Sequence, residues 1–306
     1  MFRAVALIAA LLAPAMLTYW AGHAVAAHYV ALGTVLAFNL GLLARPVGPF
    51  FALIPAVYGA AALTAQLSDG VAALIVAVAA VVGAASSQGL HRGLLAVLAA
   101  ALIGSFEPSP AEDVLLRAAA MLAGCAYGYL VAVTAAGRIE MRSLAVHPNT
   151  ALSYGMLLAV LTLVAWFAAR IAGFPHGWWL PLAVAAIGEP YLSGSAERAV
   201  SRTAIALCAT VPLLALIDSV ANPLSRGVIV LCLSMLLFTA GRRIPALQTF
   251  LLTPIVVLFA SHQPAYPDGM QYLRETLLAC AVVFTFSVLS KWVLWTLRPD
   301  AGRVTA

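Results

Sequence analysis

Residues 71–85 read VAALIVAVAAVVGAA, and no polar side chain interrupts them. A strand of a membrane barrel alternates apolar and polar residues over about 10 positions, and this stretch has no such alternation. A helix forms its backbone hydrogen bonds within itself, so it can carry apolar side chains on every face into lipid. The stretch therefore predicts a membrane-embedded α-helix.

The composition of the whole chain extends this prediction. The 306 residues are 64% hydrophobic and 9% charged, whereas a soluble domain has roughly 25% charged residues. The charges lie in short clusters, which are separated by apolar runs of about 17 to 25 residues, long enough to cross the hydrocarbon core of a bilayer. The fold class is therefore predicted to be all-α, as a polytopic integral membrane protein, and a soluble domain is excluded.

About twelve membrane-spanning helices are expected between breaks rich in charge, proline or glycine. The expected spans are 4–21, 26–44, 48–66, 71–88, 93–106, 114–136, 150–172, 177–190, 199–217, 223–240, 244–261 and 271–296. They divide the chain into a first six-helix half (1–137), a cytoplasmic connection (138–149), a second six-helix half (150–298) and a C-terminal tail (299–306). A cleavable signal peptide is the alternative for the first span, because Arg3 and the small residues Ala24-Val25-Ala26 imitate one.

The basic residues set the expected orientation. With a cytoplasmic N-terminus, twelve of the sixteen arginine and lysine residues lie inside, and only Arg117, Arg170, Arg226 and Arg274 lie outside. Positive residues concentrate in cytoplasmic loops. Both termini are therefore expected on the cytoplasmic side of a bacterial inner membrane. The placement of the net charge of +5 favours a membrane rather than a nucleic acid as the partner.

The two halves resemble each other faintly. His28-Tyr29-Val30-Ala31-Leu32 opens the second expected span much as His176-Gly177-Trp178-Trp179-Leu180 opens the eighth. Because each half has an even number of spans, the halves are expected to share one orientation as pseudo-repeats, related by an axis along the membrane normal.

The segment 176–202, HGWWLPLAVAAIGEPYLSGSAERAVSR, is the most unusual part of the chain. Pro181 lacks a backbone donor, and Pro190 ends the helix, so that backbone carbonyls become available near a solute path. The alternative is structural, with the tryptophans at the membrane interface and Glu189 paired with an arginine. The candidate site residues of this segment are His176, Trp178, Trp179, Pro181, Glu189, Arg198 and Arg202.

Three further candidates lie in other spans. Arg117 and Arg274 lie near helix ends, where a cationic side chain can contact a solute. The alternative for both is an arginine that reaches the headgroups, and Arg117 also follows Asp113 at the spacing of a helical ion pair. Asn39 is an uncharged candidate, for which an interhelical hydrogen bond is the alternative.

Small residues predict one close helix contact. Ala120, Gly124 and Gly128 repeat at four-residue spacing and would let another helix approach closely. A purely structural role in packing is favoured for them.

The pattern of an aromatic pair, a proline, an apolar run and Glu-Pro, followed by Glu197-Arg198-Ala199-Val200-Ser201-Arg202, resembles the fusaric acid resistance and aromatic acid exporter family. Arg202 matches the second arginine of the family's motif, while Ile205 and Ala206 stand where Gly-Thr is usual. The segment Arg274-Glu275-Thr276-Leu277-Leu278-Ala279 looks similar as well. The resemblance implies proton-driven efflux of aromatic or other weak organic acids, with a periplasmic adaptor protein as partner in some members.

No enzyme is expected, because P-loop, HExxH and GxSxG motifs are absent from the sequence. Four isolated cysteines without CxxC or Cys/His spacing predict no metal site, and no cofactor is expected. The leading hypothesis is a secondary exporter of organic anions. A passive organic-anion channel and a non-transporting membrane scaffold or assembly subunit are the alternatives, and a homo-oligomer stays open as a further partner.

Overall fold

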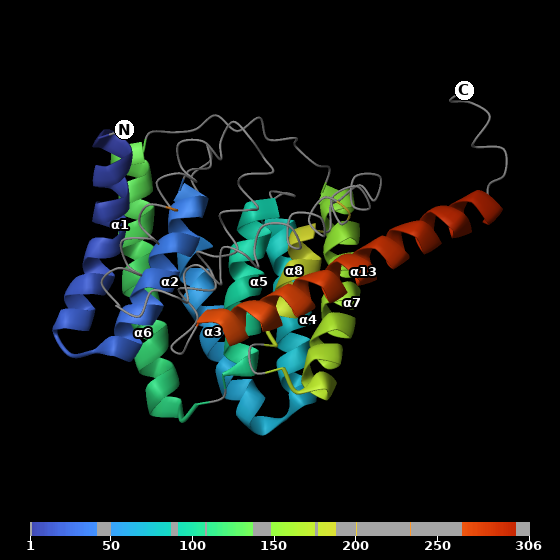
Figure 1. The fold of residues 1–306 in the computed structure, drawn as a ribbon, viewed down its shortest axis with the longest axis horizontal. Coiled ribbons are helices and arrows are strands. Elements are labelled where there is room, and N and C mark those ends of the chain that lie inside the picture. Colours follow the sequence, from blue (N-terminus) through green and yellow to red (C-terminus); the bar gives the residue numbers. More distant parts are fainter. Residues whose placement is uncertain are drawn as a thin grey trace. The chain divides into compact units, whose positions relative to one another are not determined.

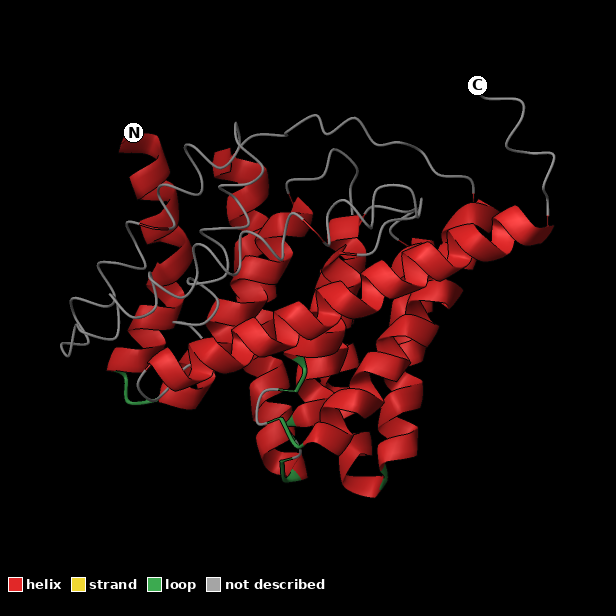
Figure 2. Ribbon diagram, turned by 45° about the vertical axis from the view of Figure 1, so that its right-hand side comes forward, coloured by secondary structure: helices red, strands yellow, loops and turns green. Residues whose placement is uncertain are grey.

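The computed structural model describes residues 2–41, 50–86, 91–107, 109–136, 148–174, 177–187, 200, 233 and 265–297. These residues are helical apart from short turns, and they include no strand (Figures 1 and 2). The elements are α1 (Phe2–Trp20), α2 (Ala24–Gly41), α3 (Phe50–Leu67), α4 (Asp69–Ser86), α5 (His91–Phe106), α6 (Ala111–Val131), the π-helical turn η1 (Ala132–Ala136), α7 (Pro148–Ala172), α8 (Trp179–Ile187) and α13 (Ala265–Leu297).

Nine of the expected spans fall on these residues, and each is a helix. The six predicted helices of the first half match α1 to α6 within a few residues. Within the span predicted over 177–190, the described helix α8 covers Trp179–Ile187, and residues 188–190 lie outside the described residues. The helix predicted over 271–296 begins earlier, at Ala265. The predicted spans 199–217, 223–240 and 244–261 lie outside the described residues, apart from two isolated positions.

The chain divides into two compact units, Met1–Leu182 and Ala183–Ala306. In the first unit α2 packs along α6, α3 along α5, and α4 along α7. Thus α7, the first helix of the predicted second half, packs against a helix of the first half. The second unit contributes α13 as its long described helix.

The closest approach in the first unit joins α2 to α6. A Cβ atom added to Gly124 would lie 2.2 Å from the carbonyl oxygen of Val30, and one added to Gly128 would lie 2.2 Å from that of Thr34. On α2, a Cβ atom added to Gly33 would lie 2.2 Å from the carbonyl oxygen of Met121. The predicted close contact at Gly124 and Gly128 is therefore confirmed, and it needs glycine on both helices.

Two of the described helices can cross a membrane by length and composition, Ala111–Thr134 and Ala151–Ala172. Their outer faces carry large apolar side chains that are more than half exposed, namely Leu115, Leu116, Leu130, Met156, Val160 and Val164. Soluble proteins rarely expose many large apolar side chains together on one helix. Lipid is the environment that suits these faces.

Two Gly→Ala substitutions separate the role of the close contact from helix propensity. Gly124→Ala should lower the thermal midpoint in detergent, because the new methyl group pushes two backbones apart; overpacking typically costs about 1–3 kcal/mol. The control is Gly59→Ala, where the nearest atom to the new methyl group would be the Cβ atom of Ala118 at 3.8 Å. This control should leave the midpoint unchanged or raise it, since alanine favours the helix. Equal midpoints for the two variants would contradict the close α2–α6 contact.

Candidate functional site

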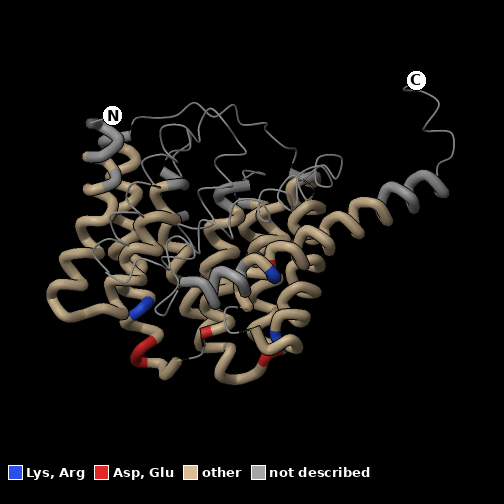
Figure 3. Tube along the Cα trace, in the orientation of Figure 1, with Lys and Arg blue, Asp and Glu red and all other residues tan. Residues whose placement is uncertain are grey.

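The charged side chains of the first unit that the structure describes gather at one end of its helices (Figure 3). There α3 leads into α4, α5 leads into α6, and α7 ends before α8. The charged residues of this unit whose side chains the structure describes are Asp69, Glu107, Glu112, Asp113, Arg117 and Arg170. Two separate polar sites form at this end, one around each arginine.

The first site, which we name the Arg117 cluster, consists of Tyr29, Tyr58, Glu107, Ser109 and Arg117. The Arg117 Nη1 atom donates a hydrogen bond to Ser109 Oγ at 2.6 Å and a longer one to Tyr29 Oη at 3.4 Å. Tyr29 Oη in turn donates to Glu107 Oε2. The cluster therefore joins α2, α6 and the connection between α5 and α6 through a tyrosine that bridges a cation and an anion.

Backbone and ring contacts fix the shape of the Arg117 cluster. The side-chain amide of Gln66, near the end of α3, donates to the carbonyl oxygen of Ser109. The Arg117 Cζ atom lies 5.5 Å from the centroid of the Tyr29 ring, and the Tyr29 and Tyr58 rings are 5.2 Å apart. A guanidinium over an aromatic face gains electrostatic energy from the ring. Tyr29 thus contacts Arg117 from the side of the helix bundle, and Tyr58 packs behind Tyr29.

Hydrogen-bonding capacity remains unused in the Arg117 cluster. Tyr29 is 3% exposed and Tyr58 is fully buried, yet the hydroxyl of Tyr58 has no hydrogen-bond partner among the described residues. Arg117 itself is half-buried, and no described carboxylate forms an ion pair with it. Buried polar groups in native proteins are nearly always paired, so an unpaired one calls for an explanation such as a ligand or an ordered water.

The ion pair with Asp113, the alternative that the four-residue spacing allowed for Arg117, does not form among the described residues. Asp113 is exposed to solvent, and Arg117 contacts Ser109 and Tyr29 instead. Side chains on a helix point back toward its N-terminus, which brings the Arg117 guanidinium to Ser109 just before α6. An exposed ion pair contributes little, with a median near 0–1 kcal/mol, so the partly buried hydroxyl groups prevail.

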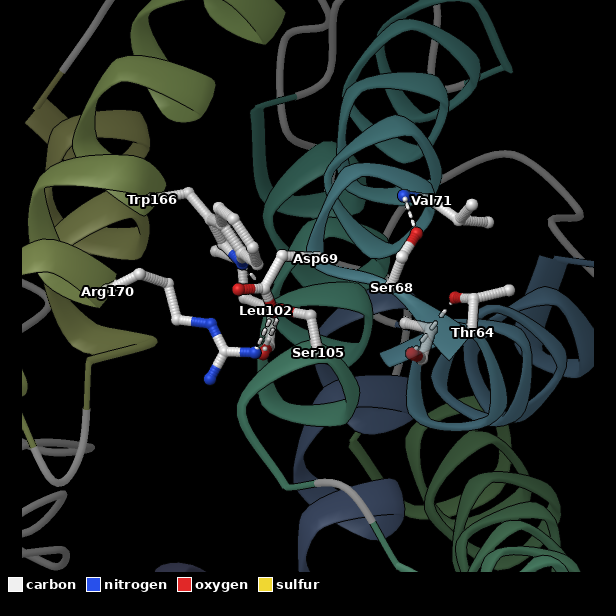
Figure 4. Close-up of polar contacts among 9 residues, drawn as sticks. Thr64, Ser68, Asp69, Val71, Leu102, Ser105, Trp166 and Arg170 are labelled. Carbon is white, nitrogen blue, oxygen red and sulfur yellow. Dashed lines mark hydrogen bonds and ion pairs between the residues drawn. The ribbon is translucent and has the colours of Figure 1, made fainter. Parts of the chain in front are cut away.

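The second site surrounds Arg170 at the end of α7. Arg170 Nη2 forms an ion pair with Asp69 Oδ1 at the start of α4, and its guanidinium lies 5.3 Å from the ring centroids of both Phe106 and Trp166 (Figure 4). Trp166 Nε1 donates to Ser105 Oγ at 2.9 Å. This site has the features of a structural clasp between α4, α5 and α7, because a carboxylate neutralises its cation directly.

The other sequence candidates are distributed along the chain. Trp178 is buried and its ring lies edge-on to that of Trp179, with centroids 5.7 Å apart. Pro181 lies in the first turn of α8, where a missing N–H breaks no helical hydrogen bond. Arg274 is exposed on α13, in the other unit. No described contact joins Trp178, Trp179 or Pro181 to the Arg117 cluster.

Five candidates fall where the structure describes no side chain. His176, Glu189, Arg198 and Arg202 lie outside the described residues, and Asn39 lies in α2 without a described side chain. Their roles stay predictions.

Sequence reasoning missed the partners of Arg117. In the sequence, Tyr29 belongs only to the faint repeat, and no motif marks Glu107. A usable signal was the expected position across the membrane. Four residues lie within about two turns of the span ends that are expected on the outer side of the membrane, namely Tyr29, Gln66, Glu107 and Arg117. Comparison of the expected positions across the membrane between spans would have grouped these four residues.

One comparison with known proteins supports the family resemblance. Residues 164–286 match the fusaric acid resistance protein-like family. The match contains the segment around 176–202 from which the resemblance was inferred, and it lies within the predicted second half. The fusaric acid resistance protein-like family implies membrane transport or resistance, and its members are transporters rather than enzymes. No curated protein and no solved structure matches the chain.

Substitution of Tyr29 should reveal whether the Arg117 cluster stabilises the fold. Tyr29→Phe removes the hydroxyl group that donates a hydrogen bond to Glu107 and accepts one from Arg117. A hydrogen bond to a charged group contributes about 1.5–3 kcal/mol to stability. We therefore expect a lower thermal midpoint for the detergent-purified chain. Tyr19→Phe is the matched control, since Tyr19 is 62% exposed on α1, and its midpoint should equal that of the wild type. An unchanged midpoint for Tyr29→Phe would show that the bridge contributes nothing.

Proposed function

We propose that the protein is a multi-pass secondary transporter of a bacterial inner membrane, which exports aromatic or other weak organic acids by using the proton gradient. The observation that carries the proposal is the match of residues 164–286 to the fusaric acid resistance protein-like family. Apolar exposed faces on α6 and α7 support a lipid environment.

The distribution of charge supports the proposed orientation. The end of the first unit that holds the Arg117 cluster carries four described acidic residues and two described arginines. Cytoplasmic ends of membrane helices are enriched in lysine and arginine. This end is therefore proposed to face the periplasm, with both chain termini in the cytoplasm.

The proposed route runs from the segment 176–202 to the opposite end of the membrane. Glu189, Arg198 and Arg202 are assigned to the cytoplasmic mouth, where arginines would attract an organic anion. Glu189 and the buried Glu275 are the candidate groups for proton coupling, since an ionisable group within a membrane protein usually serves a proton or substrate path. A periplasmic adaptor protein would continue the route beyond the membrane.

Flux into proteoliposomes tests the proposal. The purified chain should accumulate labelled benzoate in a manner that depends on an imposed pH gradient, because the carrier couples the two movements. Arg202→Ala should lower this flux by about tenfold, the effect of the loss of one charge-assisted contact. Conductance without coupling would indicate a channel, and the absence of flux for a panel of aromatic and aliphatic acids would indicate a scaffold. Normal flux in a correctly inserted Arg202→Ala variant would refute the assigned mouth.

Cysteine labelling tests the proposed topology independently. Single cysteines placed between Arg138 and Asn149 should react with a membrane-impermeant maleimide only after the membrane is opened, because this connection is proposed to be cytoplasmic. The background chain needs replacement of its four native cysteines, Cys125, Cys208, Cys232 and Cys280. A cysteine at Glu112, exposed on α6, is the control and should react in intact cells. Labelling of the 138–149 connection in intact cells would show that the proposed membrane orientation is reversed.

A further inference from the structure

The Arg117 cluster holds two features that the packing of the fold does not require. Its cation has no carboxylate in direct contact among the described residues, and its most deeply buried hydroxyl has no partner there. We propose that the cluster binds the carboxylate group of a small organic acid, with Arg117 and Tyr58 as the donors and Glu107 as the competing anion. The proposal rests on the proposed function for the identity of the ligand, but not for the existence of the site.

The chemistry of Arg117 suits a carboxylate. A guanidinium has five N–H donors in a planar fork that fits two carboxylate oxygens at once. The contacts that the structure gives Arg117 go from Nη1 to the neutral hydroxyl oxygens of Ser109 and Tyr29. These contacts orient the group without neutralising it, and since Arg117 is only half-buried, an anion can reach it from solvent.

Tyr58 supplies the second donor. Its side chain on α3 is fully buried, and its hydroxyl interacts with Tyr29, Arg117 and Glu107, so it is directed into the cluster. None of these contacts has the geometry of a full hydrogen bond. A buried hydroxyl without a partner costs roughly 1–3 kcal/mol. A ligand oxygen beside Arg117 would accept its hydrogen bond, so binding removes a penalty that the free protein carries.

Glu107 sets the affinity of the proposed site. Its carboxylate reaches Arg117 only through the Tyr29 hydroxyl, and a second carboxylate close to it would be repelled. Glu112 and Asp113 add negative charge nearby, but both are exposed on the first turn of α6, where water and salt screen them. Removal of the Glu107 charge should therefore strengthen anion binding. If Glu107 only supported the structure of the site, its removal would weaken anion binding instead.

Arg170 provides a matched comparison within the same end of the same unit. Its Nε atom lacks a partner, as does that of Arg117, but Asp69 neutralises its charge directly. Each site contains one arginine and one carboxylate, and the two sites differ in whether these groups are in direct contact. An anion should prefer Arg117.

Equilibrium dialysis of labelled benzoate against the full chain in detergent micelles tests the proposal. Arg117→Gln should weaken benzoate binding by about tenfold or more, and Tyr58→Phe by about fivefold, as expected for a charged and a neutral hydrogen bond. Arg117→Lys should lie between Arg117→Gln and the wild type, because it keeps the charge and loses the fork. Glu107→Gln should strengthen binding, and Arg170→Gln should leave it unchanged. Benzamide, which has the same ring without the charge, should not compete.

Several results would overturn the proposed site. They are the absence of benzoate binding to the wild type, equal losses in Arg117→Gln and Arg170→Gln, and weaker binding in Glu107→Gln. Size-exclusion chromatography identifies variants that do not fold, and if Arg117→Gln is among them, the opposite shifts expected for Tyr58→Phe and Glu107→Gln decide the matter.

Failure of the site and failure of the proposed function are distinguishable. Benzoate binding that depends on Arg117, in a chain that transports no acid into proteoliposomes, would retain the site and reject the transporter. Gradient-dependent benzoate transport by a chain whose binding is insensitive to Arg117 and Tyr58 would retain the transporter and reject the site.

Discussion

The described part of the first unit depends on the close approach of α2 and α6. Val30 faces Gly124 and Thr34 faces Gly128, so the two helices run parallel to each other along the contact. Tyr29 precedes Gly33 by one turn, and Arg117 precedes Gly124 by about two turns, or roughly 10 Å at 1.5 Å per residue. The glycines therefore bring the tyrosine and the arginine together at one end, and any side chain at these positions would separate them.

The two arginines at that end show how the same residue type serves different purposes in neighbouring surroundings. Arg170 lies against two aromatic rings and a carboxylate, and α7 runs antiparallel to α4 from Gly155 near Val81 to Arg170 near Asp69. Arg117 lies against a tyrosine ring and hydroxyl oxygens, and its nearest anion is one side chain farther away. Arg170, in direct contact with a carboxylate, holds helices together. Arg117, whose nearest carboxylate is reached only through Tyr29, can still bind an anionic ligand.

Sequence patterns predicted the helices well, because apolar runs bounded by charged or glycine-rich breaks depend on local composition alone. They also predicted the tight helix face at Gly124 and Gly128, but not its partner on α2, since the four-residue spacing of small residues identifies only one side of a contact. The hydrogen-bond partners of Arg117 were not predicted, for a related reason. Asp113 is close in sequence, whereas Tyr29 is 88 residues away and comes near only through the packing of α2 on α6.

Because α2 and α6 run in the same direction and α4 begins at the same end, three helix N-termini are directed to one side of the unit. Each helix macrodipole has the equivalent of about half a positive charge at its N-terminus. Asp69 lies in the first turn of α4, and Glu112 and Asp113 lie in the first turn of α6. Asp69, Glu112 and Asp113 thus have a local cause in addition to the membrane orientation, because each lies near the positive end of the helix that begins there, whereas Glu107 follows the end of α5.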